Sequence, residues 1–406
     1  LFYQKFEDGG VFRANAENFA GSPAFYYLAY NPYNPSLNGL PPGSWEDSLD
    51  SAASDYAQRK GVWFFGVYDT EIDQFALFGE ATFYLTDNVT ITAGGRWYDL
   101  DRKETLVLGA LQQGPVPSAE TDFVFTDGTG DESDDGFVPK VNVTYNFDDR
   151  SLVYFTYSEG FRSGGANALR PDSILPRQYD SDKVQNYEAG FKTTMSGGRV
   201  FLSAVAYHMI WDDIQVQVND PQPVVFQLGV VNFPEATIDG IELQGSWVPA
   251  PGWALDATLA WNDAEISESA TLFEGSDAPI TAVDGTRLPI TPDWKGSFSV
   301  EYTFADNTLL GGTPYARADY RYTGESVNAL EGLEAIVGAP PPTIQESYSV
   351  LDLRAGIDAA KWSLTGYGTN AFDEVGDQFI NNRYAKRRVT VNRPLTVGIS
   401  YRRNFR

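Results

Sequence analysis

The feature that most constrains the fold of this chain is the alternation of apolar and polar residues in about fourteen separate segments. The clearest segment runs from Trp294 to Phe304, where Lys, Ser, Glu and Thr residues alternate with Gly, Val and aromatic ones. Successive side chains of a β-strand point to opposite faces, so each segment is predicted to be a strand with one apolar and one polar face. The segments are about 9–11 residues long, which is the length a tilted strand needs to cross a bilayer.

The connections between these segments alternate strictly between short and long. The short ones lie at 86–88, 148–150, 196–198, 249–252, 305–313 and 359–360, and most are rich in the Gly, Asn, Asp and Pro of tight turns. The long ones lie at about 8–72, 108–136, 159–183, 213–237, 263–293, 324–346 and 373–388. Short connections at one end of the strands and long ones at the other predict an all-β fold, a transmembrane antiparallel up-and-down β-barrel. A soluble β-sandwich remains the alternative that alternation alone does not separate.

Composition and charge narrow the class of protein further. The chain has no cysteine, which rules out disulfides and Cys metal sites, and no run of 18 apolar residues that would form a transmembrane helix. Its net charge of −26 argues against nucleic acid as a partner. The acidic run 131–135 is predicted to be the tip of a solvated loop. Glu132 stands where a calcium loop would require Gly, so neither a metal site nor a cofactor is predicted.

Six segments, in order along the chain, resemble the C-terminal barrel of the TonB-dependent outer-membrane receptors. They are SLVYFTYSEGFRSGG (151–165), NYEAGFKT (186–193), IDGIEL (238–243), GTRLPITPDW (285–294), NAFDE (370–374) and PLTVGISY (394–401). Each motif alone is weak, but their order over about 75–406 is specific. The resemblance implies a receptor in the outer membrane of a Gram-negative bacterium.

The resemblance also implies a barrel of 22 strands and a preceding plug domain. No plug, TonB-binding segment or signal peptide is recognised here, so residues 1–406 are expected to be a partial transmembrane barrel domain with about 14 strands. Counting back from a last strand at Arg388–Phe405 makes Leu1–Glu7 the ninth strand. Arg403 stands where the family usually ends in an aromatic residue, a departure that puts the insertion signal in doubt.

The polar faces of the strands are predicted to line the lumen. A Lys on the lipid face would cost roughly 2–4 kcal/mol at the bilayer midplane, so the inward face is the favourable one. On this basis, inward-facing structural roles are predicted for five charged residues, Glu188, Lys192, Glu242, Arg317 and Arg354. Glu188 and Lys192 are expected to contact either a plug or water.

Ligand contacts are predicted near the external ends of the strands, at Phe161, Arg162, Trp211, Gln215 and Tyr384. Two alternatives are open for Arg162. Its guanidinium fork suits the carboxylate or catecholate oxygens of an anionic ligand, or it pins its own loop to a nearby carboxylate. The basic run 386–388 is predicted to meet lipopolysaccharide or to snorkel at the membrane interface.

Three classes of function follow. The favoured one, implied by the resemblance, is a receptor for TonB-energised uptake of a scarce nutrient, foremost an iron–siderophore complex, with vitamin, haem or saccharide import as variants. Its partners would be outer-membrane lipid and lipopolysaccharide, a small ligand, and the TonB complex through the missing N-terminal part. The second is a passive pore closed from about 14 strands. The third, a secreted β-rich enzyme, lacks a catalytic constellation, because His208 is the one histidine.

Overall fold

The computed structural model describes residues 2–15, 62–111, 123–169, 173–219, 228–272, 280–330, 342–381 and 388–403. Within these ranges fourteen strands form one antiparallel sheet whose order follows the chain. The strands are β1 (Phe2–Asn15), β2 (Val62–Tyr84), β3 (Val89–Leu111), β4 (Phe123–Asp148), β5 (Ser151–Arg162), β8 (Asp182–Met195), β9 (Val200–Asn219), β10 (Leu228–Trp247), β11 (Trp253–Ile266), β14 (Trp294–Thr303), β15 (Thr313–Thr323), β18 (Tyr348–Ala359), β19 (Trp362–Thr369) and β22 (Thr396–Arg403). The predicted up-and-down arrangement is confirmed.

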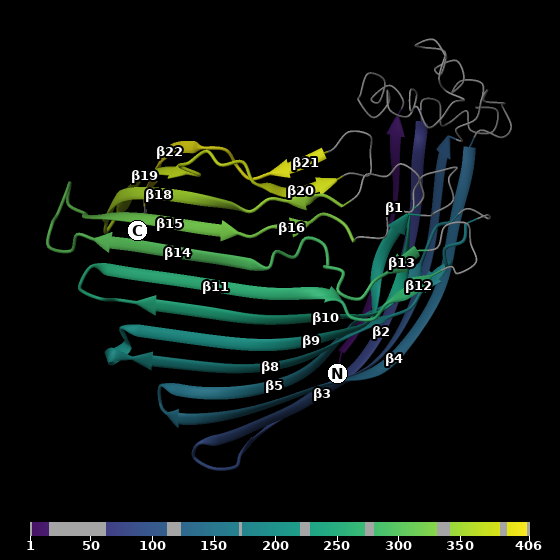
Figure 1. Ribbon diagram of the computed structural model, residues 1–406, viewed down its shortest axis with the longest axis horizontal. Helices are drawn as coiled ribbons and strands as arrows, with labels where there is room; N and C mark the ends of the chain where they lie inside the picture. Colours follow the sequence, from purple (N-terminus) through teal and green to yellow (C-terminus); the bar gives the residue numbers. More distant parts are fainter. Residues whose placement is uncertain are drawn as a thin grey trace, which may run out of the picture.

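The two ends of the sheet are built differently, as the connections predict. Every predicted short turn joins two neighbouring strands, and one of them contains the 3₁₀ turn η2 (Ser196–Gly198). The long connections at the other end carry small hairpins (Figure 1), formed by β6 (Gly165–Ala166) with β7 (Gln178–Tyr179), β12 (Ala270–Leu272) with β13 (Ile280–Ala282), β16 (Ser326–Val327) with β17 (Ile344–Gln345), and β20 (Asp377–Asn381) with β21 (Arg388–Val391). We call this end the external end. No helix in the described ranges is both long and apolar enough to cross a membrane.

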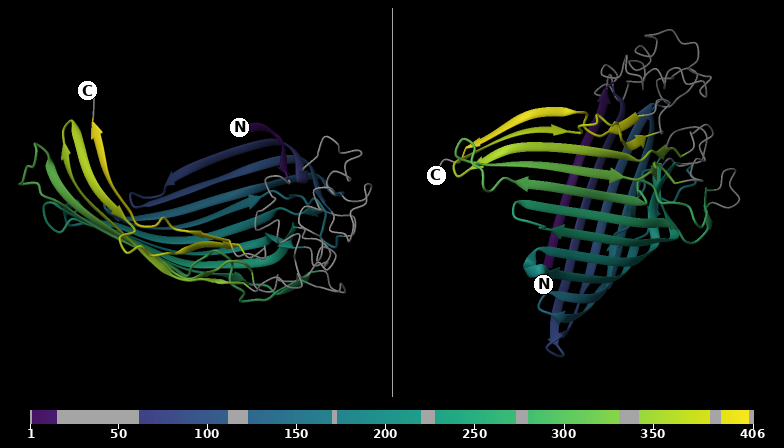
Figure 2. Two further views of the ribbon diagram at one scale, coloured as in Figure 1. Left: turned by 90° about the horizontal axis from the view of Figure 1, so that it is seen from above. Right: turned by 60° about the vertical axis from the view of Figure 1, so that its left-hand side comes forward.

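The sheet is strongly curved but open. Its two edges are β1 and β22, and each has a single neighbour in the sheet (Figure 2). The alternative of a pore closed from these fourteen strands is therefore not the arrangement that the structure shows.

One face of the sheet exposes a band of apolar side chains over nearly all of its strands. Leu243 is 44% exposed, Trp294 46% and Val397 77%, and the same face carries Phe75, Trp97, Phe137 and Phe298. A soluble sandwich would bury these side chains in a core, whereas a membrane barrel turns them toward lipid. The sandwich alternative is therefore wrong for this chain. We call this face the outer face and the opposite one the inner face.

Several strands are longer than predicted and extend past the apolar band. β2 and β3 each have 23 residues and β4 has 26. Residues 8–15 and 62–72 of one predicted loop, and 108–111 and 123–136 of another, are therefore strand. The acidic run 131–135 lies within β4, not at a loop tip. There Asp135 pairs with Asp99, and Ser133 with Asp101. Beyond the lipid neither face has to be apolar, so the alternation that reveals a strand is lost while backbone pairing continues.

The predicted strand ends also need correction at both termini of the described chain. The expected last strand, Arg388–Phe405, is broken into β21 and β22, with Pro394 between them. Proline has no backbone N–H to donate to a strand partner, which accounts for the interruption. At the other end β1 continues to Asn15, well past the predicted limit at Glu7.

The same contact between a tyrosine and a glycine of the next strand recurs on the inner face. Five tyrosine rings each lie over a glycine directly opposite on the next strand, in the pairs Tyr98–Gly136, Tyr154–Gly190, Tyr207–Gly240, Tyr315–Gly356 and Tyr367–Gly398. A Cβ atom added at Gly240 would come within 2.2 Å of Cζ of Tyr207. Packing an aromatic ring over a cross-strand glycine covers backbone that the glycine leaves bare.

The Gly240→Ala variant is expected to destabilise the folded barrel by about 1–3 kcal/mol, the range for overpacking a filled site. The new methyl group displaces the Tyr207 ring and breaks its hydrogen bond to Asn262. Urea unfolding in detergent micelles measures the loss. Gly368→Ala is the matched control, because nothing lies within 4 Å of a Cβ at Gly368. Equal unfolding midpoints for the two variants would contradict the packing argument.

Candidate functional site

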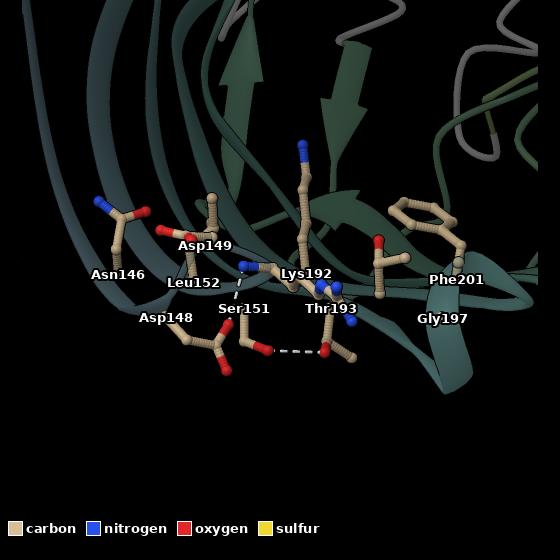
Figure 3. Close-up of a pocket in the computed structure, with 12 residues that line it drawn as sticks. Asn146, Asp148, Asp149, Ser151, Leu152, Lys192, Thr193, Gly197 and Phe201 are labelled. Atoms are coloured by element: carbon tan, nitrogen blue, oxygen red, sulfur yellow. Dashed lines mark hydrogen bonds between the residues drawn. The ribbon is translucent and has the colours of Figure 1, made fainter.

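The predicted lumen-facing residues on β8 and β10 lie on the inner face. Glu188 accepts a 2.6 Å hydrogen bond from the hydroxyl of Tyr154, and Nζ of Lys192 lies 5.3 Å from the centroid of the same ring. Glu242 shares the inner face of β10 with Gly240. Figure 3 shows Lys192 pointing away from Thr193, its neighbour, at a hollow of about 420 Å³ beside the short turns. Lys192 is therefore placed at the opposite end of the sheet from the long connections.

Arg317 and Arg354 lie directly opposite each other on β15 and β18. Arg317 donates hydrogen bonds to Oδ1 of Asp319 at 2.9 Å and to Oε2 of Glu301 at 3.3 Å. The positive charge of Arg354 also acts on Asp319. Both arginines act on Asp319, and Arg317 also pairs with Glu301, so their positive charges lie beside negative ones on this part of the inner face.

At the external end, the structure places Arg162 in an ion pair with a buried carboxylate. Arg162 ends β5, and Asp182 begins β8 directly opposite. Nε of Arg162 donates to both oxygens of Asp182, at 3.0 and 2.9 Å, and Nη2 also donates to this carboxylate. The Asp182 side chain is only 1% exposed, and it accepts a further hydrogen bond from the backbone N–H of Gln215.

Trp211 and Gln215 join the same cluster. The guanidinium carbon of Arg162 lies 4.8 Å from the Trp211 ring centroid, a cation–π contact. Nε2 of Gln215 donates to the carbonyl oxygens of Ser163 and Asp180, both at 3.0 Å. Three of the five predicted ligand residues thus come together, and their contacts hold the two ends of the 163–181 segment. This is the ion pair that the loop-pinning alternative for Arg162 describes.

The other two predicted ligand residues are not in this cluster. Phe161 stacks on Tyr98, with ring centroids 3.8 Å apart and the planes inclined by 8°. It packs against a small apolar cluster with Ala76 and Leu100. Tyr384 lies outside the described residues, as do residues 386 and 387 of the predicted basic run.

The structure adds anchoring residues that the sequence interpretation missed. Oε2 of Glu104 accepts a 2.9 Å hydrogen bond from the N–H of Ala166, and Arg102 donates to the carbonyl of Gly164 at 3.1 Å. Oγ of Ser181 donates to Asp134 at 2.6 Å. Segment 163–181 is therefore fastened to the inner face of β3 and β4. These partners are remote in sequence, and Asp134 lies where a loop was predicted, so no local pattern could have paired them.

The external end also has an apolar core of its own. Ile214, Val231 and Phe233 on the extensions of β9 and β10 pack with Leu169 and Leu288 from the long connections, and all five are buried. Asn167 donates to the carbonyl of Val230 and accepts from its N–H, both at 2.7 Å. The described parts of these connections are thus packed against the strand ends.

Two carboxyl groups at the external end have raised pKa values. Burial raises the pKa of Glu132, and the charges of Asp180 and Asp134 raise it further. Burial likewise raises the pKa of Asp213, with added effects from Asp212, Asp180 and Asp182. Asp180 acts on both groups, so these carboxylates share one neighbourhood, which we call the external carboxylate group (Glu132, Asp180 and Asp213).

Neither a metal centre nor a histidine site emerges from the described ranges. They contain no group of three or more His, Asp or Glu residues that could hold a metal ion. Nδ1 of His208 lies 2.9 Å from Oδ1 of Asp239, directly opposite on β10. Both side chains are exposed on the outer face, so this histidine is part of a surface pair.

Comparison with known proteins gives the family. The sequence model of the TonB dependent receptor-like β-barrel matches residues 3–371. The pesticin receptor of Yersinia pestis is 26% identical over 210 residues, 52% of this chain and 29% of that receptor. The ferrichrome outer membrane transporter/phage receptor of Escherichia coli K12 is 24% identical over 282 residues, 69% of this chain and 31% of that protein. The chain thus spans less than a third of these relatives.

Solved structures show the same fold. The ferric yersiniabactin uptake receptor FyuA from Yersinia pestis superimposes with a TM-score of 0.66 at 20% identity, over 85% of this chain and 48% of that receptor. The ferric-catecholate import receptor Fiu from E. coli K12, in its closed form, gives 0.61 at 18% identity, over 83% and 45%. The chain belongs to the TonB-dependent receptor β-barrel family, and it is an outer-membrane β-barrel chain.

Proposed function

We propose that this chain is part of a receptor that imports an iron–siderophore complex through TonB-energised transport. The family match over most of the chain carries the proposal. Relatives named for ferrichrome and rhizobactin, and a structural neighbour named for ferric yersiniabactin, support iron as the cargo. The packed external end supplies the surface on which a ligand would be captured. The role is transport, and no catalytic reaction is assigned.

The partners in this proposal are outer-membrane lipid and lipopolysaccharide around the outer face, a small metal chelate at the external end, and the TonB complex. The band of exposed apolar side chains supports the lipid contact. Arg162, Trp211 and Gln215 act in ligand binding by holding segment 163–181 in place.

We also propose that residues 1–406 are a partial barrel domain. The open edges at β1 and β22 support this, because unpaired strand edges in lipid each leave backbone groups without partners. Coverage of about half of the solved relatives supports it too. An antibody to this segment tests the point in purified outer membranes, where a species well above 44.8 kDa is expected. A membrane species of 44.8 kDa would contradict it.

Deleting the gene is expected to abolish uptake of the cognate ⁵⁵Fe–siderophore complex by iron-starved cells. Loss of TonB is expected to abolish it equally, because transport of this kind needs an energy source outside the barrel. Scintillation counting of washed cells measures uptake in both strains. The siderophores to be tested come from a screen of siderophore-producing bacteria. Uptake that persists without TonB would identify a passive pore. Unchanged uptake in the deletion strain would contradict the proposal that this receptor imports an iron–siderophore complex.

A further inference from the structure

The last two hairpins at the external end are joined by a buried side chain. Nε2 of Gln345, in β17, donates a 2.8 Å hydrogen bond to Oγ of Ser326 in its own hairpin. Oε1 of the same side chain accepts a 3.0 Å hydrogen bond from the backbone N–H of Ile380 in β20, and all three residues are buried. Neither hairpin can therefore move away without leaving a buried polar group unpaired.

A second side chain makes the same connection. Nδ2 of Asn328, just after β16, donates a 3.0 Å hydrogen bond to the carbonyl oxygen of Ile380, and its Oδ1 accepts one from the N–H of Thr343. The N–H and the carbonyl of Ile380 thus both bond to side chains of the neighbouring hairpin. We call β16–β17 and β20–β21, held together in this way, the paired hairpins.

The base of the β20–β21 hairpin is fixed by a buried asparagine just after β19. Nδ2 of Asn370 donates to the carbonyl oxygens of Glu374 and Arg393, at 2.8 and 3.0 Å, one on each side of the hairpin. Its Oδ1 accepts a 3.0 Å hydrogen bond from the N–H of Glu374. The backbone of Asn370 has a φ of 52°, in the left-handed region where asparagine is enriched. Asn370 thus determines where both arms of the hairpin leave the barrel wall.

Asp352 on β18 connects this base to the lumen. Its Oδ1 accepts a 2.9 Å hydrogen bond from the backbone N–H of Asn370, and its Oδ2 accepts one of 2.9 Å from Nη2 of Arg321. The Asp352 side chain is 5% exposed, whereas that of Arg321, on the inner face of β15, is 52% exposed. Asp352 therefore lies between a guanidinium that the lumen contents can reach and the residue that positions the hairpin base.

We propose that the paired hairpins open as a single cooperative unit, and that its stability is set from the lumen through Arg321 and Asp352. When an anionic group in the lumen takes the Arg321 guanidinium, the buried Asp352 carboxylate loses its counter-charge, and both hairpins open more often. The coupling is reciprocal, so anything that fixes the hairpins from outside strengthens the Arg321–Asp352 pair. This inference goes beyond the proposed function and holds whichever cargo the receptor carries.

Amide hydrogen exchange of the full-length receptor in detergent micelles, followed by mass spectrometry, tests the proposal. Arg321→Gln removes the charge that Asp352 faces. Exchange in peptides covering β20 and β16 is expected to be on the order of tenfold faster than in the wild type, by the same factor in both. A single opening unit requires this common factor, and a merely local role of Arg321 would not produce it in β16.

Arg317→Gln is the matched control. Arg317 lies four residues before Arg321 on the same face of β15, and its partners Asp319 and Glu301 lie on β15 and β14. The substitution removes the same charge from the same strand without touching Asp352. Exchange in the paired hairpins is expected to stay at the wild-type rate.

A double-mutant cycle tests the connection through Asp352. Asp352→Asn keeps an oxygen for the Asn370 N–H and removes the buried charge, so Arg321→Gln should cause no further acceleration in this background. Full acceleration there, unchanged exchange in Arg321→Gln alone, faster exchange in β20 but not in β16, or an equal effect of Arg317→Gln would each overturn the proposal. The exchange rates need no ligand, so a failure of the iron–siderophore proposal leaves the result intact.

Discussion

The Arg162→Ala variant is expected to free segment 163–181 from the wall of the barrel. Asp182 is almost fully buried, so removing its guanidinium partner leaves a carboxylate with fewer donors in a place water hardly reaches. Breaking a buried pair costs about 3–5 kcal/mol, and we expect the lower end because the Arg162 side chain is half exposed. A loss of about 3 kcal/mol in local stability makes the opened state on the order of a hundredfold more populated.

Trypsin cleavage after Arg177 reports this opening, because the bond lies within segment 163–181. The initial cleavage rate, measured by mass spectrometry on receptor in detergent micelles, should rise in proportion to the opened population. Arg199→Ala is the matched control, since Arg199 lies in an exposed short turn and donates one hydrogen bond, to Ser196. Cleavage at the wild-type rate in Arg162→Ala would refute the pinning role.

The Leu243→Arg variant is expected to impair insertion into lipid, whereas Gln244→Arg next to it is not. Leu243 lies on the outer face near the middle of the apolar band, and Gln244 lies on the inner face. An arginine facing lipid at the bilayer midplane costs roughly 2–4 kcal/mol, and the same residue facing the lumen stays in water.

Folding of the full-length receptor into lipid vesicles measures this difference. The two substitutions add the same charge to adjacent positions of β10, so the pair isolates the effect of the face. The fraction of heat-modifiable, folded protein on gels and the urea midpoint should both fall for Leu243→Arg alone. Equal losses in the two variants would mean that the faces have been assigned incorrectly.

The part of the fold that the sequence predicts is the part that lipid constrains. Between the two membrane interfaces the outer-facing residues are mostly apolar, so strands such as β14 and β18 show a two-residue period, and most of the short turns contain Gly, Asn, Asp or Pro. Beyond the lipid this constraint ends, and the extensions of β3 and β4 carry charges on both faces. They therefore look like loops, although their backbone pairing is unbroken.

The contacts of the candidate site also differ in how far the sequence predicts them. The type of partner for Arg162 could be predicted, because a guanidinium at a strand end near acidic residues favours a carboxylate. Which carboxylate it would be could not be predicted, since Asp182 is 20 positions away and becomes a neighbour only when β5 and β8 pair. The anchor Asp134 lies on a strand extension that the alternation does not reveal, and Glu104 comes near Ala166 only in the folded sheet. Long-range register, and not local pattern, decides such contacts.

The length of β2 to β4 determines what an antibody to the external end meets. At about 3.3 Å per residue the 26 residues of β4 measure roughly 85 Å, and a bilayer core of about 30 Å takes up only part of that length. The remainder is regular sheet, whose surface combines residues from neighbouring strands such as Asp99 and Asp135. Epitopes there are conformational, so short synthetic peptides from these strands should raise antibodies that do not recognise intact cells.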